Sequence, residues 1–156
     1  MEGLTCIRPL TGTDLEAVLA IEAASPEAAA WNRRAYEDIL AGASPTRCLV
    51  AEVEGNTVGF VSFRAVEHEA ELLNLAVLPA FRRLGMGARL MDQVLREAAR
   101  RGALELFLEV RDSNPGALRF YERFGFKLKS RRRGYYSHPP ADALVLHRTL
   151  RSPEAC

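Results

Sequence analysis

The stretch Arg82-Arg83-Leu84-Gly85-Met86-Gly87-Ala88 decides the fold of this chain, because it joins an apolar run to a long helical pattern. The apolar run is Leu72-Leu73-Asn74-Leu75-Ala76-Val77, and the helical periodicity covers residues 85–101. A glycine-rich turn that leads from a strand into a helix leaves several backbone N–H groups without partners. Together with the helix dipole these groups form an anion site, most often for phosphate. The stretch therefore predicts a site for a phosphorylated cofactor.

The glycine pair alone does not identify that cofactor. The loop lacks the Gly-Lys-Ser/Thr ending of nucleoside-triphosphate loops and the three-glycine spacing of dinucleotide-binding loops. Its pattern is Arg-x-x-Gly-x-Gly, in which Arg82 and Arg83 add positive charge that suits a diphosphate. A side chain at Gly85 or Gly87 would keep a diphosphate away from the backbone.

Composition indicates one globular domain. The chain has 156 residues, 48% of them apolar, and a net charge of +1. We expect a single domain over residues 1–150 and a short tail at 151–156. The balanced charge gives no support to direct nucleic-acid or membrane binding, and no apolar run approaches the roughly 20 residues of a membrane span. Cys6, Cys48 and Cys156 are widely spaced, which predicts neither a disulfide framework nor a zinc site and fits a reducing cytoplasm.

The periodicity predicts a mixed α/β sheet. Strands are expected at residues 4–8, 47–53, 57–66, 69–77, 104–110, 126–135 and 141–149. Helices are expected at 13–23, with a capping box from Thr13 to Glu16, and at 32–42, capped by Asn32, with a loop at 25–30 between them. Two further helices are expected at 85–101 and at 114–125, the second capped by Asn114. Strands 69–77 and 104–110 flank one helix and should be parallel neighbours. Ligands sit beyond the carboxyl ends of such strands, here residues 75–78 and 109–112.

Glu109 is the candidate general base. Alternation places one set of strand residues on the core face, Leu104, Leu106, Leu108 and Val110, and a second set on the other face, Glu105, Phe107, Glu109 and Arg111. A strand in this position is normally covered on both faces, where an unpaired carboxylate is costly. Glu109 therefore either accepts a proton in a reaction or forms a structural pair with Arg111 or the backbone.

Tyr121 is the candidate general acid. It follows Asn114 by two helical turns, so both residues lie on one face of the expected helix. A short connection from the preceding strand lets Tyr121 point over the same crevice as Glu109, where a phenol can protonate a leaving group. The alternative is a core tyrosine with a satisfied hydroxyl.

The C-terminal strands carry aromatic and basic residues that have two interpretations. Tyr135 and Tyr136 either line a groove or pack within their strand. The basic run before them would alternate in a strand, which places on one solvated face Lys127, Lys129, Arg131 and Arg133.

Taken together, these residues resemble the GNAT superfamily of N-acetyltransferases. Arg82-x-x-Gly85-x-Gly87 is similar to its pyrophosphate-binding motif for acetyl-coenzyme A (acetyl-CoA), and Asn114 followed by Phe120-Tyr121-Glu122 and Phe124-Gly125-Phe126 is similar to its next motif. The resemblance implies the acyl-CoA N-acyltransferase fold, with seven strands, four helices and a splayed central strand pair.

A narrower resemblance is to the bacterial RimI-type ribosomal-protein-alanine N-acetyltransferases. It is carried by Asn74-Leu75-Ala76-Val77-x-Pro79, Leu108-Glu109-Val110-Arg111-x-Ser113-Asn114, Arg132-Arg133-x-Tyr135-Tyr136 and Asp142. It implies that the substrate is the N-terminal alanine of a small-subunit ribosomal protein, with Glu109 as proton acceptor and Tyr121 as proton donor. It implies acetyl-CoA contacts from the backbone of Leu75, Ala76 and Val77, from Arg82, Arg83, Leu84, Gly85, Met86, Gly87 and Ala88, and from Asn114. Substrate contacts are expected from Trp31, Tyr135 and Tyr136, and no metal is implied.

Two other functions remain open for the same fold. The chain could acetylate a small-molecule amine or a protein lysine, or it could bind acyl-CoA as a sensor without catalysis. A sensor would not need both Glu109 and Tyr121. For an enzyme we expect direct attack by the amine, with a backbone N–H near Val77 stabilising the oxyanion and no covalent acetyl-enzyme.

Overall fold

A computed structural model describes residues 4–25 and 31–150 of the chain. Within these residues one seven-stranded sheet has the order β1-β2-β3-β4-β5-β7-β6. Its strands are β1 (Thr5–Pro9), β2 (Arg47–Val53), β3 (Asn56–Val66), β4 (Glu69–Val77), β5 (Glu105–Arg111), β6 (Lys127–Ser137) and β7 (Pro140–Thr149). The helices are α1 (Leu15–Ala23), α2 (Arg33–Leu40), α3 (Met86–Arg100) and α4 (Pro115–Arg123), with short 3-10 turns η1 (Gly12–Asp14) and η2 (Pro79–Phe81). The predicted mixed α/β class is confirmed.

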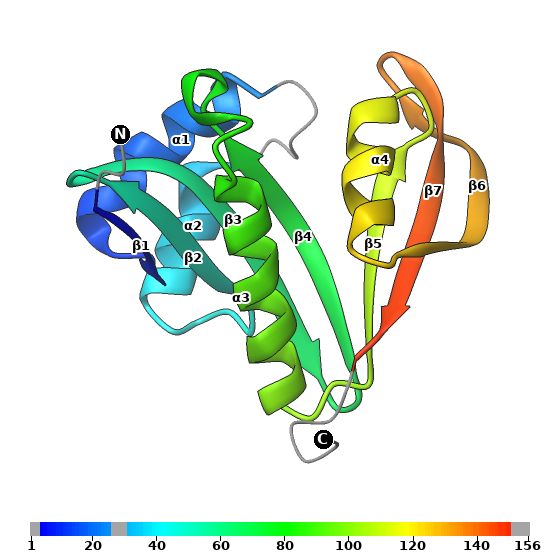
Figure 1. Ribbon diagram of the computed structural model, residues 1–156, viewed down its shortest axis with the longest axis horizontal. Helices are drawn as coiled ribbons and strands as arrows, with labels where there is room; N and C mark the ends of the chain where they lie inside the picture. The colour runs from blue at the N-terminus through cyan, green and yellow to red at the C-terminus, as the bar shows by residue number, and fades with distance from the viewer. Residues whose placement is uncertain (1–3, 26–30, 151–156) are drawn as a thin grey trace.

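The central strands β4 and β5 are parallel neighbours, as predicted, but they pair over only part of their length. Residues 69–71 of β4 pair with residues 105–107 of β5. Beyond that point the strands separate, with α3 beside β4 and α4 beside β5 (Figure 1). Leu73 is an extra residue opposite β3, because Ser62 pairs with Asn74 while Phe63 pairs with Leu72. This bulge lies two residues beyond Glu71, the last residue of β4 that pairs with β5, and a bulge bends its strand.

The sheet buries apolar side chains on both faces. On one face Leu90 and Met91 of α3 pack in the same cluster as Leu106 and Leu108 of β5. On the other face Val18 and Ile21 of α1 and Tyr36 of α2 pack against Val50 and Phe60. Helices α1 and α2 therefore cover β2, β3 and the end of β4, while the corresponding face of β5 is not covered in the same way: its residues 105, 107, 109 and 111 are all half-buried. The expectation that β5 is covered on both faces is wrong.

Local capping explains where two helices begin. The Asn32 side chain accepts a hydrogen bond from the Ala35 amide at 3.0 Å, and this confirms the predicted cap of α2. The Asn114 side chain likewise accepts one from the Ala117 amide at 3.2 Å at the start of α4. Both contacts span three residues, so the sequence alone can predict them.

The capping box predicted from Thr13 to Glu16 is wrong by two residues. The box is formed by Thr11 and Asp14, and the Asp14 carboxylate accepts a hydrogen bond from the Thr11 amide at 2.8 Å. Asp14 also accepts two hydrogen bonds from Arg8 of β1 and one from the Thr57 hydroxyl of the more distant strand β3, and these contacts favour this register. Helix α1 then ends at Ala23 as predicted, while most of the predicted loop at 25–30 and the tail at 151–156 lie outside the described residues.

Two further expectations about the strands are wrong. Leu104 is 54% exposed rather than packed, because β5 begins one residue later. The basic residues of β6 do not share one face, because bulges interrupt its pairing with β7 between Leu128 and Ser130 and again between Arg132 and Tyr136. Alternation fails wherever a bulge adds a residue.

Candidate functional site

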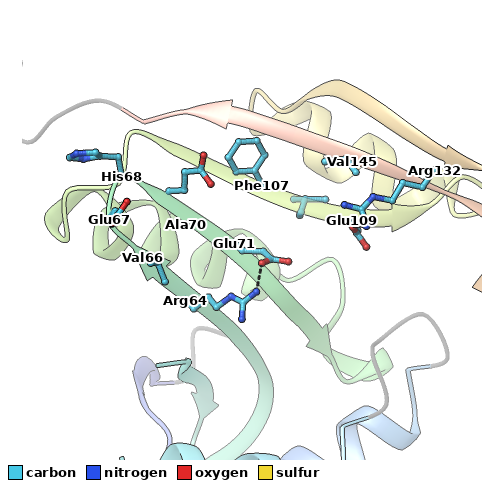
Figure 2. Close-up of a pocket in the computed structure, with 12 residues that line it drawn as sticks. Arg64, Val66, Glu67, His68, Ala70, Glu71, Phe107, Glu109, Arg132 and Val145 are labelled. Carbon is cyan, nitrogen blue, oxygen red and sulfur yellow. Dashed lines mark hydrogen bonds and ion pairs between the residues drawn. The ribbon is translucent and has the colours of Figure 1, made fainter. Parts of the chain in front are cut away.

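Glu109 lines an open cleft of about 670 Å³ on the face of the sheet opposite α3 and α4. The cleft lies where β4 and β5 still pair, and β3, β6 and β7 complete its walls (Figure 2). Glu71 of β4 and Phe107 of β5 line its floor beside Glu109. The strand that diverges from β4 therefore carries its carboxylate on the exposed face, near the point of divergence.

Each of two carboxylates in this cleft is paired with an arginine from another strand. Arg132 of β6 places Nη1 3.3 Å from Oε1 of Glu109, and Arg64 of β3 donates to Glu71 at 2.9 Å (Figure 2). Glu109 thus pairs with neither Arg111 nor the backbone, the two structural partners that the sequence suggested. The Arg132 side chain is 56% exposed, so a cationic group entering the cleft can compete with it for the carboxylate.

Tyr121 lies in the core on the other side of β5. Its ring makes edge contacts with Phe120 and Phe126, at centroid distances of 5.3 and 5.7 Å, in the cluster that contains Leu108 and Val110. Burial raises the pKa of the Tyr121 phenol above its usual value. The sequence predicted that Tyr121 and Glu109 point over the same crevice. In the structure the two residues lie on opposite faces of β5.

The gap between β4 and β5 exposes one edge of β4. The Leu78 amide donates to the Val58 carbonyl of β3 at 2.8 Å. Because successive amides of a strand alternate in direction, the Val77 and Leu75 amides point away from β3, toward β5. The Leu75 amide donates to the Asn74 side chain at 3.1 Å. The Val77 amide is therefore oriented toward the gap, where the sequence predicted an oxyanion donor.

The glycine loop before α3 needs its two glycines for different reasons. Gly85 precedes the helix with a φ of +82°, a left-handed conformation, and a Cβ placed there would meet no atom within 4 Å. A Cβ at Gly87 would lie 3.4 Å from the Phe120 ring of α4. The open space beside Gly85 leaves its backbone accessible to a ligand, whereas Gly87 lets α3 and α4 pack closely.

The start of α3 has the features of an anion site. The first helical hydrogen bond runs from the Arg89 amide to the Gly85 carbonyl at 3.0 Å, so the amides of Met86, Gly87 and Ala88 precede the helical hydrogen-bond ladder. Arg83 is exposed and has a φ of +69°. These amides and the dipole of a fifteen-residue helix favour an anion at this end.

Arg82 and Asn114 have structural partners in addition to their predicted ligand role. The Arg82 guanidinium donates to the Val77 carbonyl at 3.0 Å and to the Ser25 hydroxyl at 3.4 Å. The Asn114 side chain caps α4. Arg82 therefore ties the glycine loop to the end of β4, and Asn114 orients the helix that carries Tyr121.

Trp31 belongs to a different part of the surface. It lines a smaller cavity of about 390 Å³ together with residues of α2. Its amide donates to the Glu22 carboxylate, which also accepts a hydrogen bond from the Tyr36 hydroxyl at 2.7 Å. The Trp31 and Tyr36 rings are 5.6 Å apart. Glu22 thus connects α1 to the start of α2, a role that the sequence did not indicate.

Tyr135 and Tyr136 lie near the end of the β6–β7 hairpin. Tyr135 is 53% exposed, and the Arg132 guanidinium lies 5.5 Å from its ring centroid. Tyr136 is half-buried, with the Arg111 guanidinium 4.1 Å from its ring centroid. The pKa of Tyr136 is raised, first by burial and then by the negative charge of Glu109. This tyrosine therefore lies within electrostatic range of the candidate base.

The structure brings together some of the predicted residues and leaves others apart. Glu109 and Tyr136 are linked electrostatically, while Trp31 lines a separate cavity. The sequence assigned no role to Arg132, Arg64 or Glu71, although Arg132 belongs to a motif that carried the resemblance. Among residues 4–25 and 31–150 no group of three or more His, Cys, Asp or Glu side chains could hold a metal, and no described helix is both long and apolar enough to span a membrane.

Known proteins are similar to this chain over most of its length. Residues 15–126 match the model of the acetyltransferase (GNAT) family. The chain is 34% identical over 135 residues to the [ribosomal protein bS18]-alanine N-acetyltransferase of Escherichia coli K12, which covers 85% of this chain and 88% of that protein. It is 33% identical over 130 residues to N-alpha-acetyltransferase 50 of Danio rerio, covering 79% and 76% of the two proteins. A crystal structure of the ribosomal-protein-S18-alanine N-acetyltransferase from Escherichia coli matches with a TM-score of 0.80 and 30% identity, over 98% of this chain and 99% of that one.

Proposed function

The chain belongs to the acetyltransferase (GNAT) family, and from that premise we propose that it transfers an acetyl group from acetyl-CoA to the N-terminal α-amino group of a protein. We propose as its substrate the N-terminal alanine of a small-subunit ribosomal protein, since the Escherichia coli relative acts on such an alanine. The Danio rerio relative is also named as an N-alpha-acetyltransferase. An α-amine is the acceptor that these two relatives have in common.

Acetyl-CoA fits the glycine loop and the edge of β4. Its diphosphate would be held by the amides of Met86, Gly87 and Ala88, next to the open backbone of Gly85. The proposed contacts also include Leu75, Ala76, Val77, Arg82, Arg83, Leu84 and Asn114. When bound, acetyl-CoA supplies a thioester carbonyl as the electrophile. The Val77 amide, which points into the gap between β4 and β5, would donate a hydrogen bond to the oxyanion.

Glu109 would remove a proton from the acceptor amine, directly or through one water. A protein N-terminus loses its proton at about pH 7.7–8.0, whereas a lysine does so at about 10.4, so a modest base suffices for an N-terminus. The cleft is open on the face that carries Glu109, which gives an acceptor access to the carboxylate. The incoming ammonium would replace the exposed Arg132 guanidinium as the partner of Glu109.

Tyr121 would protonate the departing thiolate. Burial raises the pKa of its phenol, so the phenol keeps its proton through neutral pH. The same buried surroundings penalise the charge of a thiolate and make it a stronger proton acceptor than in water. A group that only donates a proton at the end of the reaction is suited to this environment.

The observation that carries the proposal is the placement of Glu109 and Tyr121 on opposite faces of β5, the strand that separates from β4 beyond Glu71 and Phe107. Acetyl transfer requires one proton to leave the amine and one to reach the thiolate, and these two atoms lie on opposite sides of the reacting carbonyl. A donor on the helix-covered face and an acceptor amine on the cleft face would meet in the gap. A sensor would have no use for this pair.

The test is acetyl transfer from acetyl-CoA to two synthetic peptides that begin with the host's small-subunit ribosomal sequence. One peptide has a free N-terminal alanine, and the other has a blocked N-terminus and an internal lysine. We expect acetylation of the first peptide only. Transfer to the lysine peptide alone, or to small amines in preference to both peptides, would refute the proposed acceptor. Binding of acetyl-CoA without any transfer would refute catalysis and favour a sensor.

A further inference from the structure

Arg111 makes contacts that the proposed chemistry does not use. It lies two residues after Glu109 on β5, so both side chains are on the cleft face of the sheet. Its Nη1 donates to the Pro139 carbonyl at 2.8 Å, and its Nη2 donates to the His138 carbonyl at 3.4 Å. Its guanidinium also lies 4.1 Å from the ring centroid of Tyr136. One arginine of β5 therefore contacts three residues of the hairpin between β6 and β7.

The pairing of this hairpin is irregular before it reaches the tip. The register between β6 and β7 is interrupted from Arg132 to Tyr136, and Gly134 has a φ of +61°. The Gly134 amide donates to the Asp142 carboxylate at 2.8 Å, which stabilises the base of the irregular segment. Tyr136 and Ser137 then pair with Ala141 and Pro140 of β7. Arg111 adds hydrogen bonds from β5 to the two tip residues between them, His138 and Pro139. A planar guanidinium suits this task, because it can donate to two carbonyls while stacking on a ring.

The hydrogen-bond partners of Arg111 separate it from the candidate base. An arginine two residues from a carboxylate on the same strand face could pair with it, but Arg111 instead donates to neutral carbonyls, and Glu109 has Arg132 as its partner. The base is therefore not tied to the residue that holds the hairpin. Rise along a strand separates Glu109 and Arg111 by about 7 Å. The rigid strand sets the spacing between the candidate base and the hairpin.

We propose that Arg111 is a positioning residue for the acceptor: by holding Tyr136 and the tip at His138 and Pro139, it fixes the hairpin as a wall of the acceptor site at a set distance from Glu109. This inference rests on the proposed function, because it assumes an acceptor polypeptide that enters beside Glu109. Arg111 itself takes no part in the proton transfers. Its loss weakens acceptor binding and leaves the acetyl-CoA site intact, since that site lies at the start of α3.

The experiment compares Arg111→Gln, Arg111→Lys and Arg100→Gln with the wild-type chain. Arg100 is a matched control, because it is an exposed arginine at the end of α3 whose one ion pair within the described part of the chain is with Glu97 at 3.5 Å. For each protein KM and kcat are measured for the alanine peptide, KM is measured for acetyl-CoA, and amide hydrogen exchange is measured over residues 132–142. We expect Arg111→Gln to raise the peptide KM about tenfold, with an unchanged KM for acetyl-CoA and faster exchange in the hairpin. Arg111→Lys should be intermediate, because lysine retains the charge but not the fork of donors.

Unchanged peptide KM and unchanged hairpin exchange in Arg111→Gln would overturn the proposal. Equal weakening of peptide and acetyl-CoA binding would also overturn it, because that result indicates general destabilisation. If the wild-type chain acetylates no peptide, the proposed function has failed by that result alone. Hairpin exchange then decides separately whether Arg111 holds the wall, with faster exchange in Arg111→Gln supporting the inference and unchanged exchange refuting it.

Discussion

Replacement of Asp14 by Asn provides the sharpest test of what stabilises the N-terminal half of the sheet. Asp14 is 3% exposed. Its carboxylate accepts hydrogen bonds from both terminal nitrogens of Arg8, at 2.7 and 2.8 Å, from the Thr11 amide at 2.8 Å and from the Thr57 hydroxyl at 2.8 Å. One carboxylate thereby joins β1, η1 and β3. Asn has the same shape but no charge, and its NH₂ group would face donors that need an acceptor.

The expected loss follows from the burial of the pair. Removal of one partner of a buried ion pair costs about 3–5 kcal/mol, because the other charge is left without compensation. The Arg8 side chain is 27% exposed, so water can solvate part of its charge, and we expect the lower limit, about 3 kcal/mol. A chain of this size loses about 3 °C of melting temperature per kcal/mol, so the transition of Asp14→Asn should fall by about 9 °C.

The acid dependence gives the same test a second readout. The hydrogen bonds from Arg8 hold the pKa of Asp14 well below its usual value. A carboxyl group with a depressed folded-state pKa contributes stability above its unfolded value, about 3.9, and loses it as the pH falls further. Thermal unfolding followed by circular dichroism at pH 7 and at successively lower pH should show a larger loss in the wild-type chain than in Asp14→Asn.

The matched control is Asp38→Asn, since Asp38 pairs with Arg34 on the exposed surface of α2. Surface pairs of this kind contribute little, so its melting temperature should not change measurably. A loss below about 1 kcal/mol in Asp14→Asn at pH 7 would refute the burial argument. An unchanged acid dependence in that variant would show that other carboxyl groups govern acid unfolding.

Three further predictions concern the proposed reaction. Glu109→Gln should lower kcat for the alanine peptide about a hundredfold, and raising the pH above about 8 should restore part of the rate, because the amine then loses its proton unaided; wild-type turnover at neutral pH would exclude this base. Tyr121→Phe should lower kcat by a similar factor while acetyl-CoA still binds in calorimetry; an unchanged kcat would identify Tyr121 as a core residue only. Gly85→Ala should lower the free energy of unfolding by about 1 kcal/mol in denaturant and raise the KM for acetyl-CoA, because Gly85 has a φ of +82°. Its control is Gly12→Ala, where a Cβ meets no atom within 4 Å and φ is not positive; equal behaviour of the two variants would contradict the argument.

The sequence predicts this fold wherever the deciding contacts are local. The caps at Asn32 and Asn114 depend on a side chain and an amide three residues apart, and both cap the helices as expected. The capping box at the first helix failed for the opposite reason. Thr11 and Thr13 each precede an acidic residue by three positions, and contacts from outside this segment, from Arg8 and from the distant Thr57, favour Asp14. Local patterns leave such a choice open, because both registers satisfy the same rule.

In the candidate site, too, the sequence predicts what local alternation decides and does not predict contacts between strands. Alternation along β5 predicts that Glu109 and Arg111 share a face, and the structure agrees. It does not predict their partners, because those depend on the register of β6, which two bulges shift. Arg132 reaches Glu109, and Arg111 reaches the hairpin tip. The roles of Glu109 and Tyr121 stay predictions until they are measured.

The separation of β4 and β5 has a local cause, the bulge at Leu73, that the sequence does not predict. Parallel pairing with β5 ends at Glu71, and the extra residue of β4, Leu73, comes two positions later. Side chains of β4 change faces across this bulge, so Leu72 packs with α3 while Asn74 and Ala76 turn to the opposite face. A bulge also increases the twist of its strand, which directs the end of β4 away from β5. Leu72, Leu73 and Asn74 are each compatible with a regular strand, so the sequence does not predict the bulge. In the structure the Val77 amide nevertheless faces the open gap beyond it. The space in which the two proposed proton transfers would meet therefore depends on one inserted residue.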